Sequence, residues 1–290
     1  MSTGRAGHVA RSIPRPNDET PGCTPLRTFL RTVDGVPIHS VYDPGPAVYD
    51  TRRPLSVDPV FVIAHGFTGA VDRPHIRRVA RAFGRHGAVV TFSFRGHGES
   101  GGRSTVGDRE VYDLAAAVRW ARELGHTRVV TVGFSMGGSV VLRHAALHGS
   151  DGTAADADDM ARTDAVVSVS APARWYYRGT APMRRLHWLV TRPEGRLVGR
   201  YGFGTRIHHR EWDPVPLSPV EAVPRIAPTP LLIVHGEQDG YFPLDHPRML
   251  AAAAGDHGEL WLEPGMGHAE HAADDRLLAR IGDWAVARAG

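Results

Sequence analysis

Short runs of apolar residues alternate along the chain with stretches that have helical spacing. Continuous runs of apolar and β-branched residues are typical of strands buried on both faces of a sheet. Such runs occupy 60–64, 89–92, 129–132, 165–169, 231–234 and 260–262. Between them, apolar residues recur three and four positions apart over 76–83, 111–118 and 277–285, which predicts helices. The alternation predicts an α/β fold with a mostly parallel central sheet and helices on both faces.

The first part of the chain departs from this pattern. Two strand-like segments, 26–32 and 37–42, are joined by Val33-Asp34-Gly35, and Asp-Gly between such segments is a strong hairpin signal. The hairpin would add an antiparallel edge to the sheet. Residues 1–24 are rich in proline, glycine and arginine without periodicity, so we expect a flexible N-terminal tail. We expect residues 25–290 to form one domain.

A long interval interrupts the alternation before the strand predicted at 231–234. About sixty residues separate this strand from the previous one, several times the length of an ordinary connection. Inserted segments of this kind often cover an active site, so we predict a small cap of short helices over 172–224. Its aromatic residues, such as Trp175, Tyr176 and Trp188, either line a pocket or pack the cap onto the core.

Composition excludes several classes of protein. The 290 residues are 42% hydrophobic and 22% charged, which is ordinary for a globular protein. The formal net charge is only +3 and the charges are scattered, so we expect no nucleic-acid partner. Cys23 is the only cysteine, so no intrachain disulfide can form, and the absence of lysine excludes lysine-dependent chemistry. With no apolar stretch of membrane-span length and no signal-peptide pattern, we expect a cytoplasmic protein.

One glycine-rich motif suggests a nucleophile. Gly133-Phe134-Ser135-Met136-Gly137 follows directly on the apolar run 129–132 and precedes a new apolar segment. Gly-x-Ser-x-Gly between a strand and a helix has the form of a nucleophile elbow, a strained turn that exposes the serine hydroxyl. The alternative is a glycine-rich turn with an inert serine. The strand before it, the helical pattern after it and suitable partners downstream favour a nucleophilic serine.

A nucleophilic serine needs a base, and the base needs an acid that orients it. Asp239 and His268 each follow directly on a predicted strand, and they come after the serine in the order acid, then histidine. Because the carboxyl ends of parallel strands meet at one edge of a sheet, we expect Ser135, Asp239 and His268 to converge there.

Other residues could take these two roles. Glu237 and Asp245 are alternative acids, but an orienting carboxylate should come directly after its strand, which favours Asp239. His271 is the alternative base. We expect it to lie about one helical turn beyond His268 and to point away from the serine.

The oxyanion formed by attack on a carbonyl requires at least two N–H donors. The backbone N–H of Met136, directly after the serine, is expected to supply one of them. The second should come from the loop His65-Gly66-Phe67-Thr68-Gly69, which follows the first central strand, and the N–H of Phe67 is our candidate.

These motifs resemble those of the α/β-hydrolase fold superfamily, and within it those of the esterase, lysophospholipase and serine-aminopeptidase-like branch. The matching segments are His65-Gly66-Phe67, Phe94-Arg95-Gly96-His97-Gly98-Glu99-Ser100, Gly133-Phe134-Ser135-Met136-Gly137-Gly138, His235-Gly236-x-x-Asp239-x-x-Phe242-Pro243 and Gly267-His268. The resemblance implies the α/β-hydrolase fold, no cofactor and no metal, and it makes His97 part of a structural turn. Serine at the elbow argues against the epoxide hydrolases and haloalkane dehalogenases of this fold, which use aspartate there.

The sequence therefore predicts a serine hydrolase that cleaves a carboxylic ester or thioester of a small-molecule acyl substrate through an acyl-enzyme. Alternatives on the same fold are an acyltransferase and a small-peptide aminopeptidase or amidase. The peptidase would need an acidic group for the substrate amine, such as Glu211, Asp213 or Glu221. An alternative of another class is a non-catalytic binding protein or receptor. The oligomeric state stays open.

Other chemistry has weaker support in the sequence. His208-His209, Asp256-His257 and His268-x-x-His271 carry metal-ligand residue types, but none supplies three convergent groups at a suitable spacing. We therefore expect no metal site. Gly96-x-Gly98 and Gly101-Gly102 match neither Walker nor Rossmann spacing, so we expect no nucleotide cofactor.

Overall fold

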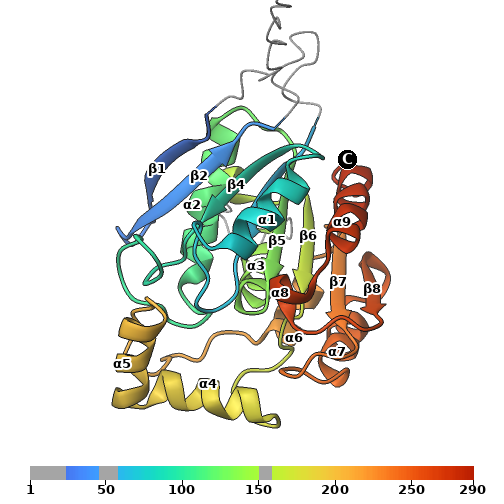
Figure 1. Ribbon diagram of the computed structural model, residues 1–290. Coiled ribbons are helices and arrows are strands. Elements are labelled where there is room, and N and C mark those ends of the chain that lie inside the picture. The colour runs from blue at the N-terminus through green and yellow to red at the C-terminus, as the bar shows by residue number, and fades with distance from the viewer. Residues whose placement is uncertain (1–23, 46–57, 150–158) are drawn as a thin grey trace, which may run out of the picture.

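The computed structural model describes residues 24–45, 58–149 and 159–290, which are built around an eight-stranded sheet (Figure 1). The strands are β1 (Leu26–Arg31), β2 (Pro37–Asp43), β3 (Val60–Ala64), β4 (Ala88–Phe92), β5 (Val129–Phe134), β6 (Ala165–Val169), β7 (Leu231–Gly236) and β8 (Gly258–Glu263). Their order across the sheet is β1-β2-β4-β3-β5-β6-β7-β8. Strands β3 to β8 pair in parallel, whereas the β1–β2 hairpin is antiparallel and joins β4 antiparallel at one edge. This arrangement confirms the predicted α/β fold.

Helices connect the strands and cover both faces of the sheet (Figure 1). The helices are α1 (Pro74–Phe83), α2 (Glu110–Glu123), α3 (Met136–Leu147), α4 (Ala181–Thr191), α5 (Pro193–Gly202), α6 (Pro219–Ala222), α7 (Asp245–Ala254), α8 (Ala269–Ala272) and α9 (Asp275–Arg288). Short 3₁₀ turns occupy Asp159–Ala161, Val223–Arg225 and Gly255–His257. Buried side chains of α2, α3 and α7 form one core layer, and those of α1 and α9 form the other.

The continuous apolar runs of the strands fill both core layers. In β3, Val60, Val62 and Ala64 pack in the layer of α2 and α3, whereas Phe61 and Ile63 pack in the layer of α1 and α9. None of these five residues is more than 1% exposed. Successive side chains of a strand point to opposite faces, so a strand between two helical layers needs an apolar residue at every position.

The parallel strands bring four loops to one edge of the sheet. β3 ends at Ala64, directly before the loop that contains Phe67, and β5 ends directly before Ser135. The loops that contain Asp239 and His268 follow the carboxyl ends of β7 and β8. Helices α4 and α5 lie at the end of the molecule opposite the C-terminus (Figure 1).

The interval before β7 contains helices and no long strand. Residues 172–224 include α4, α5 and α6, and the cap assigned to this interval stays a prediction. The tail expected over residues 1–24 falls, apart from residue 24, outside the described residues, as does Cys23. Within the described ranges, no helix combines the length and apolar character that crossing a membrane requires.

Two leucines of α3 test the contribution of the core. Leu142 is fully buried and Leu147, on the same helix, is 50% exposed. We expect Leu142→Ala to lower the free energy of unfolding by about 2–5 kcal/mol, because it removes transfer free energy and leaves a cavity. Leu147→Ala should change it by less than about 0.5 kcal/mol. Urea unfolding of both variants measures the difference, and equal losses would contradict this packing of α3.

Candidate active site

Ser135 occupies a strained turn between β5 and α3. Its φ is +52° and its ψ is −112°, a backbone conformation that residues with a Cβ rarely adopt. The Ser135 N–H donates to the carbonyl of Val169 at the end of β6, 2.9 Å away. The turn thus lifts the hydroxyl above the sheet edge while a backbone hydrogen bond ties the residue to the neighbouring strand.

The turn requires glycine on both sides of the serine. A Cβ on Gly133 would lie 2.2 Å from the carbonyl oxygen of Gly137. A Cβ on Gly137 would lie 2.1 Å from the carbonyl oxygen of Ala64 at the end of β3. Both distances are far below van der Waals contact and both obstructing atoms belong to the backbone, so neither side chain could be accommodated by a rotamer change.

A chain of two hydrogen bonds joins the serine to a buried carboxylate. His268 Nε2 lies 2.9 Å from Ser135 Oγ, and His268 Nδ1 lies 2.8 Å from Asp239 Oδ2. The other carboxylate oxygen of Asp239 accepts the backbone N–H groups of Tyr241 and Phe242, at 2.8 and 3.1 Å. The Asp239 side chain is only 1% exposed. Three groups thus donate hydrogen bonds to this carboxylate, while the nearby Nε2 of His235, 3.6 Å from Oδ2, is bonded to the carbonyl of Phe242.

These donors decide the charge of Asp239. Burial alone would raise the pKa of its carboxyl, but the hydrogen bond and charge of His268 and the two backbone N–H groups outweigh burial and lower the pKa below its ordinary value. Asp239 is consequently ionised at neutral pH and accepts the Nδ1–H of His268. This tautomer leaves the lone pair of Nε2 directed at the Ser135 hydroxyl.

Neighbouring groups hold the imidazole in place. The N–H of Ala269, the next residue, donates to Ser170 Oγ at 3.0 Å. The ring of Tyr241 stacks on the His268 ring with centroids 4.2 Å apart. The His268 side chain remains 18% exposed, so the imidazole is held in place but still open to solvent and to a ligand.

The structure leaves the alternative acids and base apart from the serine. Asp245 pairs with Arg174 at 2.8 Å on the exposed surface. The Glu237 side chain is exposed. The ring of His271 lies against that of His75, with centroids 4.0 Å apart. Of the candidates weighed from the sequence, the structure therefore brings only Asp239 and His268 to Ser135.

The loop after β3 is held by two buried polar side chains. His65 accepts the Phe94 N–H at Nε2, so its Nδ1 carries the hydrogen and donates to the carbonyl of Gly66 at 2.7 Å. The N–H of Gly66 donates in turn to Glu270 Oε1 at 3.1 Å. Within residues 24–45, 58–149 and 159–290, neither the Phe67 N–H nor the Met136 N–H has a hydrogen-bond partner. Both donors are thus available to a ligand.

A cavity of about 360 Å³ opens beside the serine. Ser135, Phe67 and Met136 form part of its lining, and further lining comes from Trp175 and Trp212 of the interval 172–224. The exposed Trp188 is not among the lining residues. The cavity therefore places a largely apolar wall against the candidate nucleophile.

The two lining tryptophans are fixed by their N–H groups. The indole N–H of Trp175 donates to the carbonyl of Pro216 at 2.9 Å, and that of Trp212 donates to the carbonyl of Thr105 at 2.7 Å. The two rings meet edge to face with centroids 5.1 Å apart. This wall is therefore built in advance of ligand binding.

Comparison with known proteins places this geometry in a family. A sequence model described as the alpha/beta hydrolase family matches residues 61–281. The chain belongs to the alpha/beta hydrolase family. The match confirms the superfamily that the motifs resemble, and the chain is a hydrolase enzyme of the α/β-hydrolase type.

One sequence relative and two solved structures illustrate what this alpha/beta hydrolase is similar to. A monoacylglycerol lipase of Mycolicibacterium smegmatis is 28% identical over 248 residues, which cover 76% of this chain and 85% of that protein. The solved structure of the esterase Pf2001 from Pyrococcus furiosus has a TM-score of 0.67 and 21% identity, with 92% of each chain covered. The alpha/beta hydrolase GrgF from Penicillium sp. sh18 has a TM-score of 0.67 and 18% identity, covering 92% of this chain and 99% of that one. At these identities the two structures show the fold alone.

Sequence reasoning missed several residues that build the site. Glu270 holds the loop of this alpha/beta hydrolase through Gly66, although 204 positions separate the two residues. Tyr241 stacks on His268, and Ser170 anchors the residue after it. An aromatic residue two positions after Asp239 was a weak signal for Tyr241. The other two act through tertiary contacts that periodicity and motif spacing do not reveal.

The buried imidazoles of His65 and His97, near the loop that follows β3, are neutral. Burial lowers the pKa of His65 well below its ordinary value and lowers that of His97 to about 4. The Nδ1–H of His97 donates to the carbonyl of Arg95 at 3.0 Å, while its buried Nε2 has no partner within the described residues. The centroids of the His65 and His97 rings lie 5.1 Å apart, so a positive charge on one imidazole would also disfavour a positive charge on the other. His97 thus has the structural position that the family resemblance implies.

This burial makes the stability of the hydrolase dependent on pH. In the unfolded chain a histidine takes up a proton below about pH 6.5, whereas folded His97 stays neutral until about pH 4. The unfolded state therefore binds more protons between these values. We expect the free energy of unfolding to fall as the pH drops from about 6.5 towards 4.

Urea unfolding at a series of pH values between about 7.5 and 4.5 measures this fall. His97→Gln, whose amide cannot gain a proton, should show a shallower fall than the wild type, and its stability at the highest pH shows that the variant folds. Identical pH dependence in the two proteins would contradict the buried neutral state of His97.

Proposed function

We propose that this alpha/beta hydrolase is a serine hydrolase that cleaves a carboxylic ester or thioester through an acyl-enzyme. The observation that carries the proposal is the hydrogen-bonded chain from Ser135 through His268 to the ionised Asp239, at the wall of an apolar cavity. A base within hydrogen-bond reach of the nucleophile and an acid that fixes its tautomer are the two requirements of this chemistry.

The reaction proceeds in two balanced halves. Ser135 Oγ forms a bond to the carbonyl carbon while its proton passes to His268 Nε2, and the negative oxygen of the tetrahedral intermediate accepts the N–H groups of Phe67 and Met136. His268 then returns the proton to the departing alcohol or thiol, which leaves Ser135 acylated. In the second half, water attacks the acyl carbon while its proton passes to His268. His268 then returns the proton to Ser135 Oγ, so the carboxylic acid is released and the serine is restored. Asp239 stays ionised and stabilises the imidazolium in both halves.

The relatives and the cavity support an ester with an apolar acyl group. The monoacylglycerol lipase and the esterase Pf2001 named above act on carboxylic esters according to their names. The cavity beside Ser135 is walled by the fixed rings of Trp175 and Trp212 and by Met183. Apolar walls with a few directing polar groups are typical of small-molecule sites. An apolar acyl chain is the part of such a substrate that these walls would bury.

One observation favours a second candidate, a small-peptide aminopeptidase. Glu211 lies in the lining of the cavity, where its carboxylate could bind the amino group of a substrate. Glu221, by contrast, is engaged in a capping box with Ser218 at the start of α6. The ester is preferred because Glu211 shares the lining with four arginines, whose positive charges would oppose binding of a charged amino group; they are Arg174, Arg178, Arg196 and Arg210.

A fluorophosphonate probe tests the nucleophile without a choice of substrate. We expect intact-mass spectrometry to detect one adduct on the wild type and none on Ser135→Ala, because only an activated serine attacks the phosphorus. The same substitution should lower ester hydrolysis by about 10⁴-fold or more. Ser139, which also lines the cavity, provides the matched control, and Ser139→Ala should keep the adduct. No adduct on folded wild type would contradict the proposal and favour the non-catalytic binding protein.

A pair of aspartate variants tests the orienting acid. We expect Asp239→Asn to lower kcat by about 10⁴-fold with little change in KM, because the amide donates to His268 Nδ1 and favours the wrong tautomer. Asp245→Asn is the control, since this alternative acid pairs with Arg174 on the surface. Steady-state kinetics on a series of ester chain lengths gives both constants. A loss in Asp245→Asn equal to that in Asp239→Asn would overturn the assignment.

A further inference from the structure

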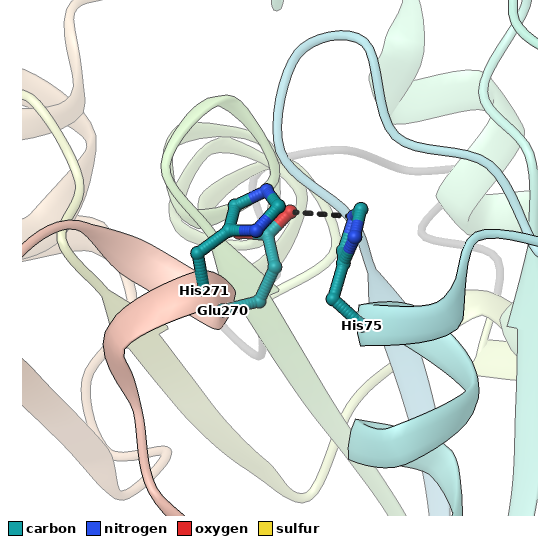
Figure 2. A group of neighbouring side chains, drawn as sticks. All are labelled: His75, Glu270 and His271. Atoms are coloured by element: carbon teal, nitrogen blue, oxygen red, sulfur yellow. Dashed lines mark ion pairs between the residues drawn. The ribbon is translucent and has the colours of Figure 1, made fainter.

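Three metal-ligand side chains gather outside the candidate active site. Figure 2 shows His75, from α1, facing Glu270 and His271, from α8. One donor atom of each lies within 4.8 Å of the donor atoms of the other two. His75 Nε2 is 3.9 Å from Glu270 Oε1, and the rings of His75 and His271 are 4.0 Å apart. None of the three lines the cavity beside Ser135.

The donor set is that of a transition-metal ion. Two imidazoles and one carboxylate suit Zn²⁺, which binds three protein ligands and water when one coordination position stays open. Mg²⁺ prefers oxygen ligands in octahedral geometry and does not match this set. Donors around tetrahedral Zn²⁺ lie about 3.4 Å apart, so the three side chains must close by up to about 1.4 Å. His271 is exposed and can rotate to do so.

The surroundings of the cluster fix the carboxylate of Glu270 and direct the positive charge of Arg78. The Glu270 side chain is 4% exposed and already accepts the Gly66 N–H, so its carboxylate is fixed before any ion binds. Arg78 is bonded to the backbone of the cluster through the carbonyl of Glu270. Its guanidinium pairs with Asp275 at 2.8 Å and donates to the carbonyls of Glu270 and Ala273, which turns its charge towards acceptors of α8 and α9.

We propose that His75, Glu270 and His271 form a site for a zinc-like divalent ion that joins α1 to α8. The ion would link the element that follows the Phe67 loop to the element that begins directly after His268. Glu270 is the shared residue, because its carboxylate faces both the site and the N–H of Gly66. The ion would lie outside the cavity beside Ser135, and its binding does not depend on the serine chemistry.

Isothermal titration of untagged, chelator-treated protein with ZnCl₂ tests the site, with MgCl₂ titrated in parallel. We expect one Zn²⁺ per chain and no binding of Mg²⁺. His75→Ala, His271→Ala and Glu270→Gln should each weaken Zn²⁺ binding at least tenfold. The glutamine can still accept the Gly66 N–H, so Glu270→Gln removes the metal ligand while it keeps the structural contact. Unfolding temperature with and without Zn²⁺ gives a second readout, with a rise of about 5 °C at about 100 times Kd.

Two control variants locate the ion. His209→Ala removes one ring of the stacked His208–His209 pair, and His268→Ala removes the histidine beside Asp239; both should bind Zn²⁺ as the wild type does. Absence of Zn²⁺ binding to folded wild type would overturn the proposal. So would loss of binding in either control with retention in His271→Ala, or binding of Mg²⁺ as tight as that of Zn²⁺. None of these outcomes bears on the fluorophosphonate result, so the two proposals fail independently.

Discussion

The close packing of backbone against backbone at the Ser135 turn is the constraint on which the rest of the site depends. Holding a residue with a Cβ at φ +52° costs about 1–3 kcal/mol, and the cost must be offset by the surrounding structure. Gly133 and Gly137 allow the turn to approach its own carbonyl groups and the end of β3. The hydrogen bond from Ser135 N–H to Val169 then fixes it to β6. This turn sets the position of the Ser135 hydroxyl, and therefore the position that each group in contact with the hydroxyl must take.

Protonation states around the turn are set by burial and by donors rather than by exposed ion pairs. Asp239 remains ionised in a buried position because His268 and the backbone N–H groups of Tyr241 and Phe242 donate hydrogen bonds to it. His65 and His97 remain neutral because a proton would be buried without an acceptor. Asp239 and the two imidazoles that support the loop with the free Phe67 N–H are thus each held in one state at neutral pH.

Much of the sheet and of the residue positions along its edge could be predicted from the sequence, because one geometric rule governs them. The apolar run 60–64 coincides with β3, and the strand expected at 89–92 differs from β4 by one residue. Once the strands are parallel, the residues that follow β5, β7 and β8 must lie at one edge. Glu270 could not be found in this way. It reaches Gly66 only because α8 folds back against the start of α1, and no local pattern encodes that contact.

The interval 172–224 could not be resolved from the sequence for a different reason. Its aromatic residues have two roles that look alike in a pattern: Trp175 and Trp212 line the cavity, whereas Trp188 is 47% exposed and does not. What separates them is the partner of the indole N–H, a backbone carbonyl at Pro216 for Trp175 and at Thr105 for Trp212. Hydrogen bonds from the indole N–H groups to backbone carbonyls thus hold the wall, whereas the sheet holds Ser135. Changes in the wall can therefore alter which ligand fits the cavity without disturbing the turn that holds Ser135.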